Sequence, residues 1–192
     1  MSFYQFAKTA VKIFLKPKYK VQSFGTENIP KEGPVIICSN HISNYDPPIV
    51  GITSPRPIHF MAKEELFDNK VFGFILRHVN AFPIKRGMSD RNALRRGLEV
   101  LKDGHVLGLF PEGTRSKTGE IKRGLAGAGF FALRSKATIV PCAIIGQYKS
   151  KNPLKVVYGK PVNMESMRAN KSSAQEVTDA IMEEIKKIKE NH

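Results

Sequence analysis

The feature that most constrains this chain is a series of short apolar runs separated by segments with helical periodicity. The runs at 35–38, 106–110 and 139–145 are each about one strand long. The run at 106–110 is apolar throughout, which is typical of a strand buried on both faces of a parallel sheet. The sequence therefore predicts an α/β fold, with a mostly parallel central sheet flanked by helices.

Turn and capping signals divide the chain into expected elements. Strands are predicted at 35–39, 58–62, 81–84, 106–110, 138–145 and 155–158. Helices are predicted at 47–52 with Asp46 as N-cap, at 63–79, from Ser89 to Gly104, at 124–136, and after a capping box of Ser173 and Glu176. The glycines at 124–129 lack dinucleotide-binding spacing and are expected to allow close helix packing. The apolar segment 71–76 is expected to pack in the core, with contact with lipid as the alternative.

Composition places the chain among globular proteins with an anionic partner. Its 192 residues suit one domain with a real core. The formal net charge of +14 favours a phosphate ligand, an anionic lipid surface or nucleic acid. Cys38 and Cys142 lie in apolar runs, and they are expected to be buried thiols in a reducing compartment.

The N-terminus has the pattern of a basic amphipathic helix. Its apolar residues at helical spacing are Phe3, Phe6, Ala7, Ala10, Val11 and Phe14. Lys8, Lys12 and Lys16 fall on the opposite face. No stretch of the sequence reaches the roughly 20 apolar residues that a spanning helix needs. A helix lying in a membrane interface and a helix packed on the domain fit this pattern equally well.

Three polar loops follow predicted strands, at 40–46, 85–87 and 111–116. Ligands of open α/β sheets gather at the carboxyl ends of the strands, where these loops begin. The candidate site residues in them are His41, Asp46, Arg86, Glu112, Gly113, Thr114 and Arg115. This set offers a base, carboxylates and arginines for chemistry on an anionic substrate.

The first loop contains a histidine and a carboxylate five positions apart. Histidine exchanges a proton near neutral pH, and a carboxylate on one ring nitrogen leaves the other free as a base. For an isolated pair, a simpler reading is that Asp46 caps a helix and His41 closes a turn. The serine nucleophile motif G-x-S-x-G is absent from the sequence, so a base at His41 would activate a nucleophile on the substrate.

The other two loops suit an anion. Arg86 and Arg115 can each form two hydrogen bonds to a phosphate, and Gly87 and Gly113 leave the nearby backbone accessible. Glu112 is expected either to bind a substrate hydroxyl or to pair with an arginine.

Four segments together resemble a known family. In chain order they read N-H-I-S-N-Y-D, F-P-I-K-R-G, F-P-E-G-T-R-S and I-V-P-C-A, between Asn40 and Ala143. They resemble the four ordered motifs of the glycerolipid acyltransferase family, and within it the bacterial lysophosphatidic acid acyltransferases. Four motifs in the family's order favour a catalytic reading of His41 and Asp46. Many relatives have glycine near Asn80, which is a departure.

The resemblance implies a reaction and a role for each residue. His41 would deprotonate the sn-2 hydroxyl of lysophosphatidic acid, and Asp46 would orient His41. The hydroxyl would attack the thioester of acyl-CoA or acyl-carrier protein to give phosphatidic acid, with no metal or other cofactor. The acceptor site would comprise Arg86, Glu112, Gly113, Thr114 and Arg115.

The resemblance also implies where the protein works. Residues 1–20 would form a membrane-interface helix and residues 21–192 the acyltransferase domain. The protein would be monotopic on the cytoplasmic face of the cell membrane, bound to anionic lipid. One alternative is another acceptor, such as glycerol 3-phosphate or another lysolipid. The other is a non-catalytic basic module for anionic membranes or nucleic acid, although no RNA- or DNA-binding signature is seen and no nucleic-acid partner is expected.

Overall fold

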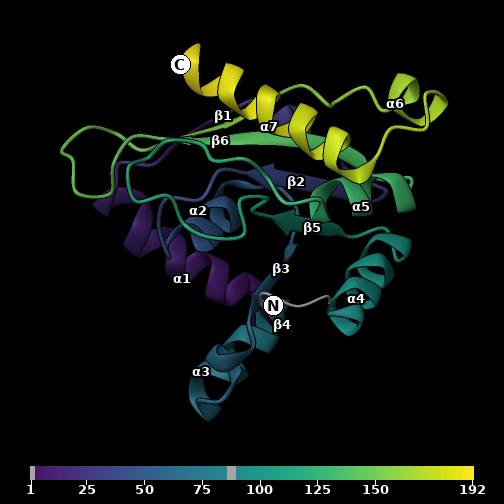
Figure 1. Cartoon of the computed structure of the whole chain (residues 1–192). Coiled ribbons are helices and arrows are strands. Elements are labelled where there is room, and N and C mark those ends of the chain that lie inside the picture. Colours follow the sequence, from purple (N-terminus) through teal and green to yellow (C-terminus); the bar gives the residue numbers. More distant parts are fainter. Residues whose placement is uncertain (1–2, 86–89) are drawn as a thin grey trace.

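The structure, a computed structural model, describes residues 3–85 and 90–192 and is built on one seven-stranded sheet (Figure 1). The strands are β1 (Gln22–Phe24), β2 (Val35–Ser39), β3 (Ile58–Lys63), β4 (Ala81–Ile84), β5 (Val106–Leu109), β6 (Thr138–Ile145) and β7 (Lys155–Tyr158). Their order across the sheet is β1-β7-β6-β2-β5-β3-β4. Every neighbouring pair is parallel except β6 and β7, which are antiparallel. The predicted α/β fold with a mostly parallel sheet is therefore confirmed.

Helices cover both faces of the sheet. They are α1 (Phe3–Lys18), α2 (Asp46–Thr53), α3 (Lys70–His78), α4 (Arg91–Lys102), α5 (Gly127–Arg134), α6 (Glu165–Ala169) and α7 (Ala174–Glu190). Alternate residues of β2 point to opposite faces. Ile36 joins a core cluster with residues of α4, α5 and α7, whereas Ile37 joins a second cluster with residues of α1 and α2. In Figure 1, α7 lies above the sheet and α1 and α2 lie below it.

The segment from 63 to 79 differs from the prediction of one helix. Strand β3 continues to Lys63, a 3₁₀ turn covers Glu64–Phe67, and α3 begins only after Asn69, whose side chain accepts a hydrogen bond from the N–H of Phe72. The expected core packing of 71–76 is also wrong, since the side chain of Val71 is 73% exposed. Helix α3 follows the 3₁₀ turn and precedes the edge strand β4, and it projects from the body of the molecule (Figure 1).

Helix and strand ends differ from the prediction at several places. Helix α4 begins after Asp90, whose side chain accepts from the N–H of Ala93, and the predicted cap Ser89 lies outside the described residues. Helix α5 begins three residues later than predicted. Strand β1 was not predicted, because its three residues are all exposed and give no apolar signal. Asn80 has φ of 63°, a left-handed conformation that glycine adopts readily and asparagine tolerates.

The C-terminal helix and the cysteines match their predictions. Ser173 and Glu176 form the capping box that begins α7. Cys38 and Cys142 are both buried and unpaired, and burial raises the pKa of each thiol to about 12. Both residues therefore stay as neutral thiols at physiological pH.

Close packing of α5 on α7 depends on one glycine. The backbone N–H of Gly129 donates to Oγ1 of Thr178, and a β-carbon at Gly129 would collide with the carbonyl oxygen of Ala174. At Gly127, in the first turn of the same helix, a β-carbon would meet no neighbouring atom within 4 Å. The predicted role of this glycine-rich segment in close helix packing is confirmed.

We expect Gly129→Ala to lower the free energy of unfolding by about 1–3 kcal/mol, because the added methyl group forces α5 away from α7. Chemical denaturation of the full chain measures the change. Gly127→Ala is the matched control and should leave stability unchanged or slightly raised, since alanine favours helix and the position is open. Equal effects of the two substitutions would contradict this account.

Candidate active site

The candidate site lies where the carboxyl ends of β2, β5 and β6 meet at one edge of the sheet. These strands are adjacent and parallel, with β2 in the middle. The loops that follow them therefore begin side by side, and the long loops after β5 and β6 lie together at the left of Figure 1. Two of the three loops predicted from the sequence to form the site start from this group of strands, and the third follows β4.

The histidine and the aspartate of the first loop are in direct contact. Nδ1 of His41 lies 2.7 Å from Oδ2 of Asp46. The same oxygen also accepts the N–H groups of Ile42 and Ser43, at 2.6 Å and 2.7 Å. A carboxylate can only accept, so Nδ1 carries the proton of this hydrogen bond. Within the described part of the chain Nε2 has no hydrogen-bond partner, and it is the nitrogen left for a substrate.

Asp46 does not cap α2, which corrects one prediction. The N-cap is Tyr45, without a side-chain capping bond, and Asp46 is the first helical residue. Its carboxylate turns back to the preceding loop and is fully buried. Its other oxygen, Oδ1, accepts the hydroxyl of Tyr148 at 2.7 Å. The geometry therefore favours the functional reading of this residue over the helix-capping alternative.

The loop after β5 holds the backbone of His41 on both sides. The N–H of His41 donates to Oε1 of Glu112 at 2.8 Å, and its carbonyl accepts the N–H of Ser116 at 2.7 Å. The imidazole ring stacks on Phe110, with ring centroids 4.3 Å apart. Asn40 pairs with β6, since its side chain bonds both the N–H and the carbonyl of Ile144. The position of His41 is thus fixed by the strands on either side of β2.

Glu112 is a buried link between loops. Oε1 accepts from His41, and Oε2 accepts the backbone N–H of Lys122 at 3.1 Å. Its carboxylate forms no ion pair with an arginine among residues 3–85 and 90–192. The expected contact of Glu112 with a substrate hydroxyl stays a prediction.

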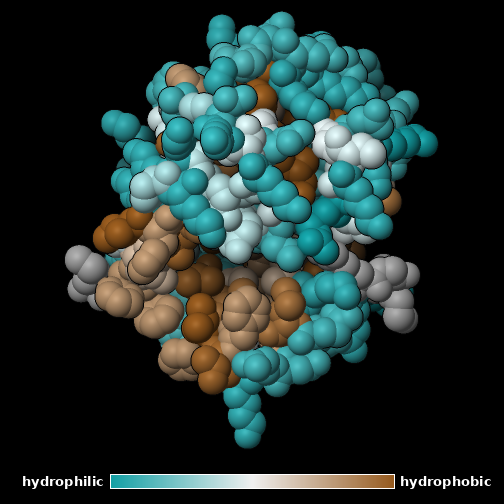
Figure 2. Space-filling model, turned by 90° about the vertical axis from the view of Figure 1, so that its left-hand side faces the viewer, coloured by the Kyte–Doolittle hydropathy of each residue, from teal (hydrophilic) through white to brown (hydrophobic). Residues whose placement is uncertain are grey.

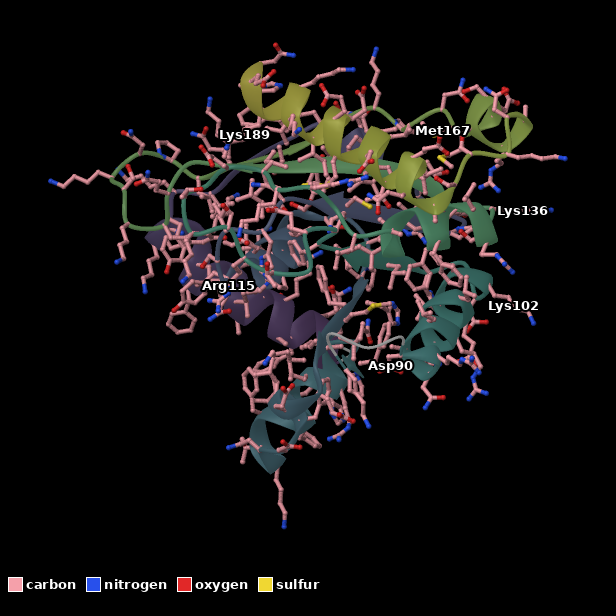
Figure 3. The ribbon with its side chains drawn as sticks, viewed as in Figure 1. Asp90, Lys102, Arg115, Lys136, Met167 and Lys189 are labelled. Atoms are coloured by element: carbon pink, nitrogen blue, oxygen red, sulfur yellow. The ribbon has the colours of Figure 1, made fainter. Side chains whose placement is uncertain are left out.

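Three of the remaining predicted site residues follow Glu112 on the same loop. Gly113 has φ of 68°, and a β-carbon there would collide with the side chain of Leu125. Thr114 and Arg115 are exposed on the same loop, where Figure 3 labels Arg115. Arg86 lies outside the described residues, directly after Lys85. The structure therefore brings His41, Asp46 and Glu112 into one network and places 113–115 beside it.

Tyr148 was not predicted from the sequence. It lies three residues after β6, and its hydroxyl reaches Asp46. Burial raises the pKa of Tyr148 well above its ordinary value, and the negative charge of Asp46 adds to this effect. The available signal was a fourth polar loop after an apolar strand, at 146–151.

The fold and the site together define an α/β protein with a buried histidine–aspartate pair at the carboxyl edge of a mostly parallel sheet. A family model described as acyltransferase matches residues 20–145. The chain belongs to this acyltransferase family, as the four motifs indicated.

Individual relatives agree with this assignment. The chain is 31% identical to the 1-acyl-sn-glycerol-3-phosphate acyltransferase of Bacillus subtilis, with 96% of each chain covered. It is 29% identical to the protein of that name from Streptococcus pneumoniae, over 86% of this chain and 64% of the relative. The crystal structure of the 1-acyl-sn-glycerophosphate (LPA) acyltransferase PlsC from Thermotoga maritima is similar, with a TM-score of 0.77 and 25% identity. That match covers 98% of this chain and 81% of PlsC.

We expect Glu112→Gln to lower the free energy of unfolding by about 1–3 kcal/mol. The amide nitrogen cannot accept a hydrogen bond, so one buried N–H of His41 or Lys122 loses its partner. Thermal or chemical unfolding measures the loss. Glu120→Gln, an exposed position on the same loop, is the control and should change stability by no more than about 0.5 kcal/mol. A Glu112→Gln protein as stable as the wild type would show that this link is unimportant.

Proposed function

We propose that this enzyme transfers a fatty acyl group from acyl-CoA or acyl-carrier protein to the sn-2 hydroxyl of lysophosphatidic acid. The product is phosphatidic acid, a precursor in phospholipid synthesis. Its relatives carry the name of this activity. The observation that carries the proposal is the 2.7 Å contact between His41 and Asp46 at the strand edge, with Nε2 left for the substrate.

The proposed reaction is a direct transfer. Nε2 of His41 takes the proton of the substrate hydroxyl as its oxygen attacks the thioester carbonyl. Asp46, bonded to Nδ1, holds the ring in the required tautomer and stabilises the imidazolium. Collapse of the tetrahedral intermediate breaks the carbon–sulfur bond, and the leaving thiolate takes the proton back from Nε2. General-base help of this kind is typically worth ~10²–10⁴ in rate.

The acceptor phosphate is assigned to the arginines of the second and third motifs. Arg115 is exposed and has no ion-pair partner in the described part of the chain, so its guanidinium is available to a phosphate. Arg86 is proposed as the second contact from its motif. Glu112, Gly113 and Thr114 complete the acceptor site, with Glu112 shaping the loop through its two backbone hydrogen bonds. The reaction needs no further cofactor, because the thioester is already activated.

The proposed location is the cytoplasmic face of the cell membrane. No helix among residues 3–85 and 90–192 is both long and apolar enough to cross a bilayer. Two helices instead form one exposed surface, here called the α1–α3 surface. Its residues are Phe3, Phe6, Ile13 and Phe14 from α1 and Val71, Phe72, Phe74 and Ile75 from α3, each at least 39% exposed. Exposed apolar surfaces of this kind mark sites of protein or membrane contact.

The α1–α3 surface is continuous and lies on the same side of the molecule as the site loops. The rings of Phe3 and Phe74 are in edge contact, with centroids 6.1 Å apart. Figure 2, which views the molecule from the left of Figure 1, shows hydrophobic residues over the left and centre of the lower half of that face and mostly hydrophilic ones above. A monotopic position would place the site loops next to the lipid that supplies the acceptor and receives the product.

The charge and the packing of helix α1 are consistent with this position at the membrane surface. Helix α1 is both packed and exposed: Val11 and Leu15 contact the core beside α2, and Lys8 donates to the carbonyl of Ser54. The exposed Lys12 and Lys16 lie beside the apolar residues of α1, where they can meet anionic headgroups. The packing of the N-terminal helix on the domain is thus observed, and the membrane-interface role is proposed for the exposed side of the same helix.

We expect Phe14→Asp to weaken binding to phosphatidylglycerol vesicles by about ten-fold or more. The side chain of Phe14 is 74% exposed, and burying a phenylalanine in an apolar medium is worth about 1.5–3 kcal/mol. Vesicle sedimentation measures the loss. Ser166→Asp adds the same charge at an exposed position of α6, which lies on the other face of the sheet from α1, and should have a much smaller effect. Unchanged binding by Phe14→Asp would exclude this surface as the contact.

We expect His41→Ala to reduce phosphatidic acid formation by at least ~10²-fold, because the general base is lost. The assay uses lysophosphatidic acid with acyl-CoA, and then with acyl-carrier protein, in detergent micelles. His105→Ala is the control, because His105 is exposed and lies at the opposite end of β5 from the site. This variant should retain full activity. Equal rates for wild type and His41→Ala would show that His41 is not the base. If the folded wild type does not acylate lysophosphatidic acid with either donor and yet acylates glycerol 3-phosphate, that result would make glycerol 3-phosphate the acceptor.

A further inference from the structure

The hydroxyl of Tyr148 is a fourth donor to the carboxylate that holds the histidine. It lies 2.7 Å from Oδ1 of Asp46, whereas His41 Nδ1 and two backbone N–H groups all bond to Oδ2. The two oxygens thus have separate tasks. Oδ1 has no other partner among residues 3–85 and 90–192, so Tyr148 alone in that part of the chain fixes the second end of the carboxylate.

This second contact adds to the bonds that limit rotation of the carboxylate. A carboxyl group turns about its Cβ–Cγ bond with a broad torsional preference, and that rotation moves both oxygens. The three bonds to Oδ2 resist it at one end, and the bond from Tyr148 resists it at the other. The line from Oδ2 to Nδ1, and with it the direction of the imidazole ring, therefore depends in part on the hydroxyl of Tyr148.

Tyr148 is itself held by two other tyrosines. Tyr19, the residue after α1, meets its ring edge-on with centroids 5.0 Å apart, and Tyr45 lies at 5.8 Å. Backbone hydrogen bonds fix Tyr19 at the end of α1, where its N–H donates to Leu15 and its carbonyl accepts from Leu154. The raised pKa of Tyr148 keeps the hydroxyl protonated, so it remains a donor. Tyr45 belongs to the first motif loop, so the end of α1 and the first motif loop both contact the ring of Tyr148.

We propose that Tyr148 is a positioning residue of this enzyme, which holds the Oδ1 end of the Asp46 carboxylate and through it helps to direct His41. The kinetic test of this proposal rests on the proposed function, whereas the geometry behind it is independent of that function. It adds the loop after β6 to the three loops that the motifs define. Tyr148 acts through Asp46 and is not proposed to touch the substrate.

The first test is Tyr148→Phe in the full-length enzyme. Phenylalanine keeps the ring between Tyr19 and Tyr45 and removes only the hydroxyl. We expect kcat to fall about ten-fold with KM unchanged, since a hydrogen bond to a charged group is lost but no substrate contact is. Tyr19→Phe is the matched control, because it removes a hydroxyl from the same aromatic cluster that does not reach Asp46. Wild-type kcat in Tyr148→Phe would overturn the proposal.

A double-mutant cycle tests whether Tyr148 acts through Asp46. If it does, adding Tyr148→Phe to Asp46→Asn should cost much less than it costs in the wild type. The full ten-fold loss in both backgrounds would mean that Tyr148 acts elsewhere, and would overturn the proposal.

Nuclear magnetic resonance of the His41 Nδ1 proton gives a readout that needs no substrate. We expect Tyr148→Phe to change its chemical shift and to speed its exchange with water, and Tyr19→Phe to leave both as in the wild type. An unchanged resonance in Tyr148→Phe would argue for a purely space-filling tyrosine. If the wild type forms no phosphatidic acid but the resonance responds, the positioning role stands and the proposed function fails.

Discussion

The architecture of the site depends on one fully buried carboxylate. A carboxylate removed from water is stable only when its oxygens accept hydrogen bonds, and Asp46 accepts four. Three of these donors come from its own loop, and the fourth comes from Tyr148 after β6. The need to satisfy one buried charge therefore joins two loops that are 102 residues apart in the sequence. A histidine bonded to such a group has a fixed orientation before any substrate arrives.

The parallel sheet makes this convergence possible at little conformational cost. Strands β5, β2 and β6 are neighbours with matched directions, so the residues after each strand emerge at the same edge. Glu112 uses the same geometry from the other side, where it ties the N–H of His41 to the loop after β5. Glycines are found where backbone must approach closely, as at Gly129 against the carbonyl of Ala174. Strands and buried hydrogen bonds thus hold the residues of the site in place.

The polar network of the candidate site and the exposed apolar surface of α1 and α3 occupy separate regions on one side of the molecule. The network around His41 is buried behind the sheet edge, whereas the α1–α3 surface is open. In the proposed reaction, the substrate hydroxyl would meet the first environment and the surrounding lipid the second. Helix α3 contributes to this arrangement because it extends past the edge strand β4, where the structure gives it little to pack against (Figure 1). Its apolar residues look like core residues in the sequence and become surface residues in the fold.

The sequence by itself determined the fold class, most of the strands and the polar loops that hold the chemistry. The hydrophobic periodicity and the length of an apolar run depend on neighbouring side chains in the sequence. Strands such as β2 and the capping box of α7 were therefore predictable. The tertiary structure alone decided which partners those residues take. The choice between helix cap and histidine partner for Asp46, the engagement of Glu112 by backbone N–H groups, and the contribution of Tyr148 all depend on contacts between distant segments. No local pattern encodes which loops a sheet brings together, because strand order is set by packing of the whole chain.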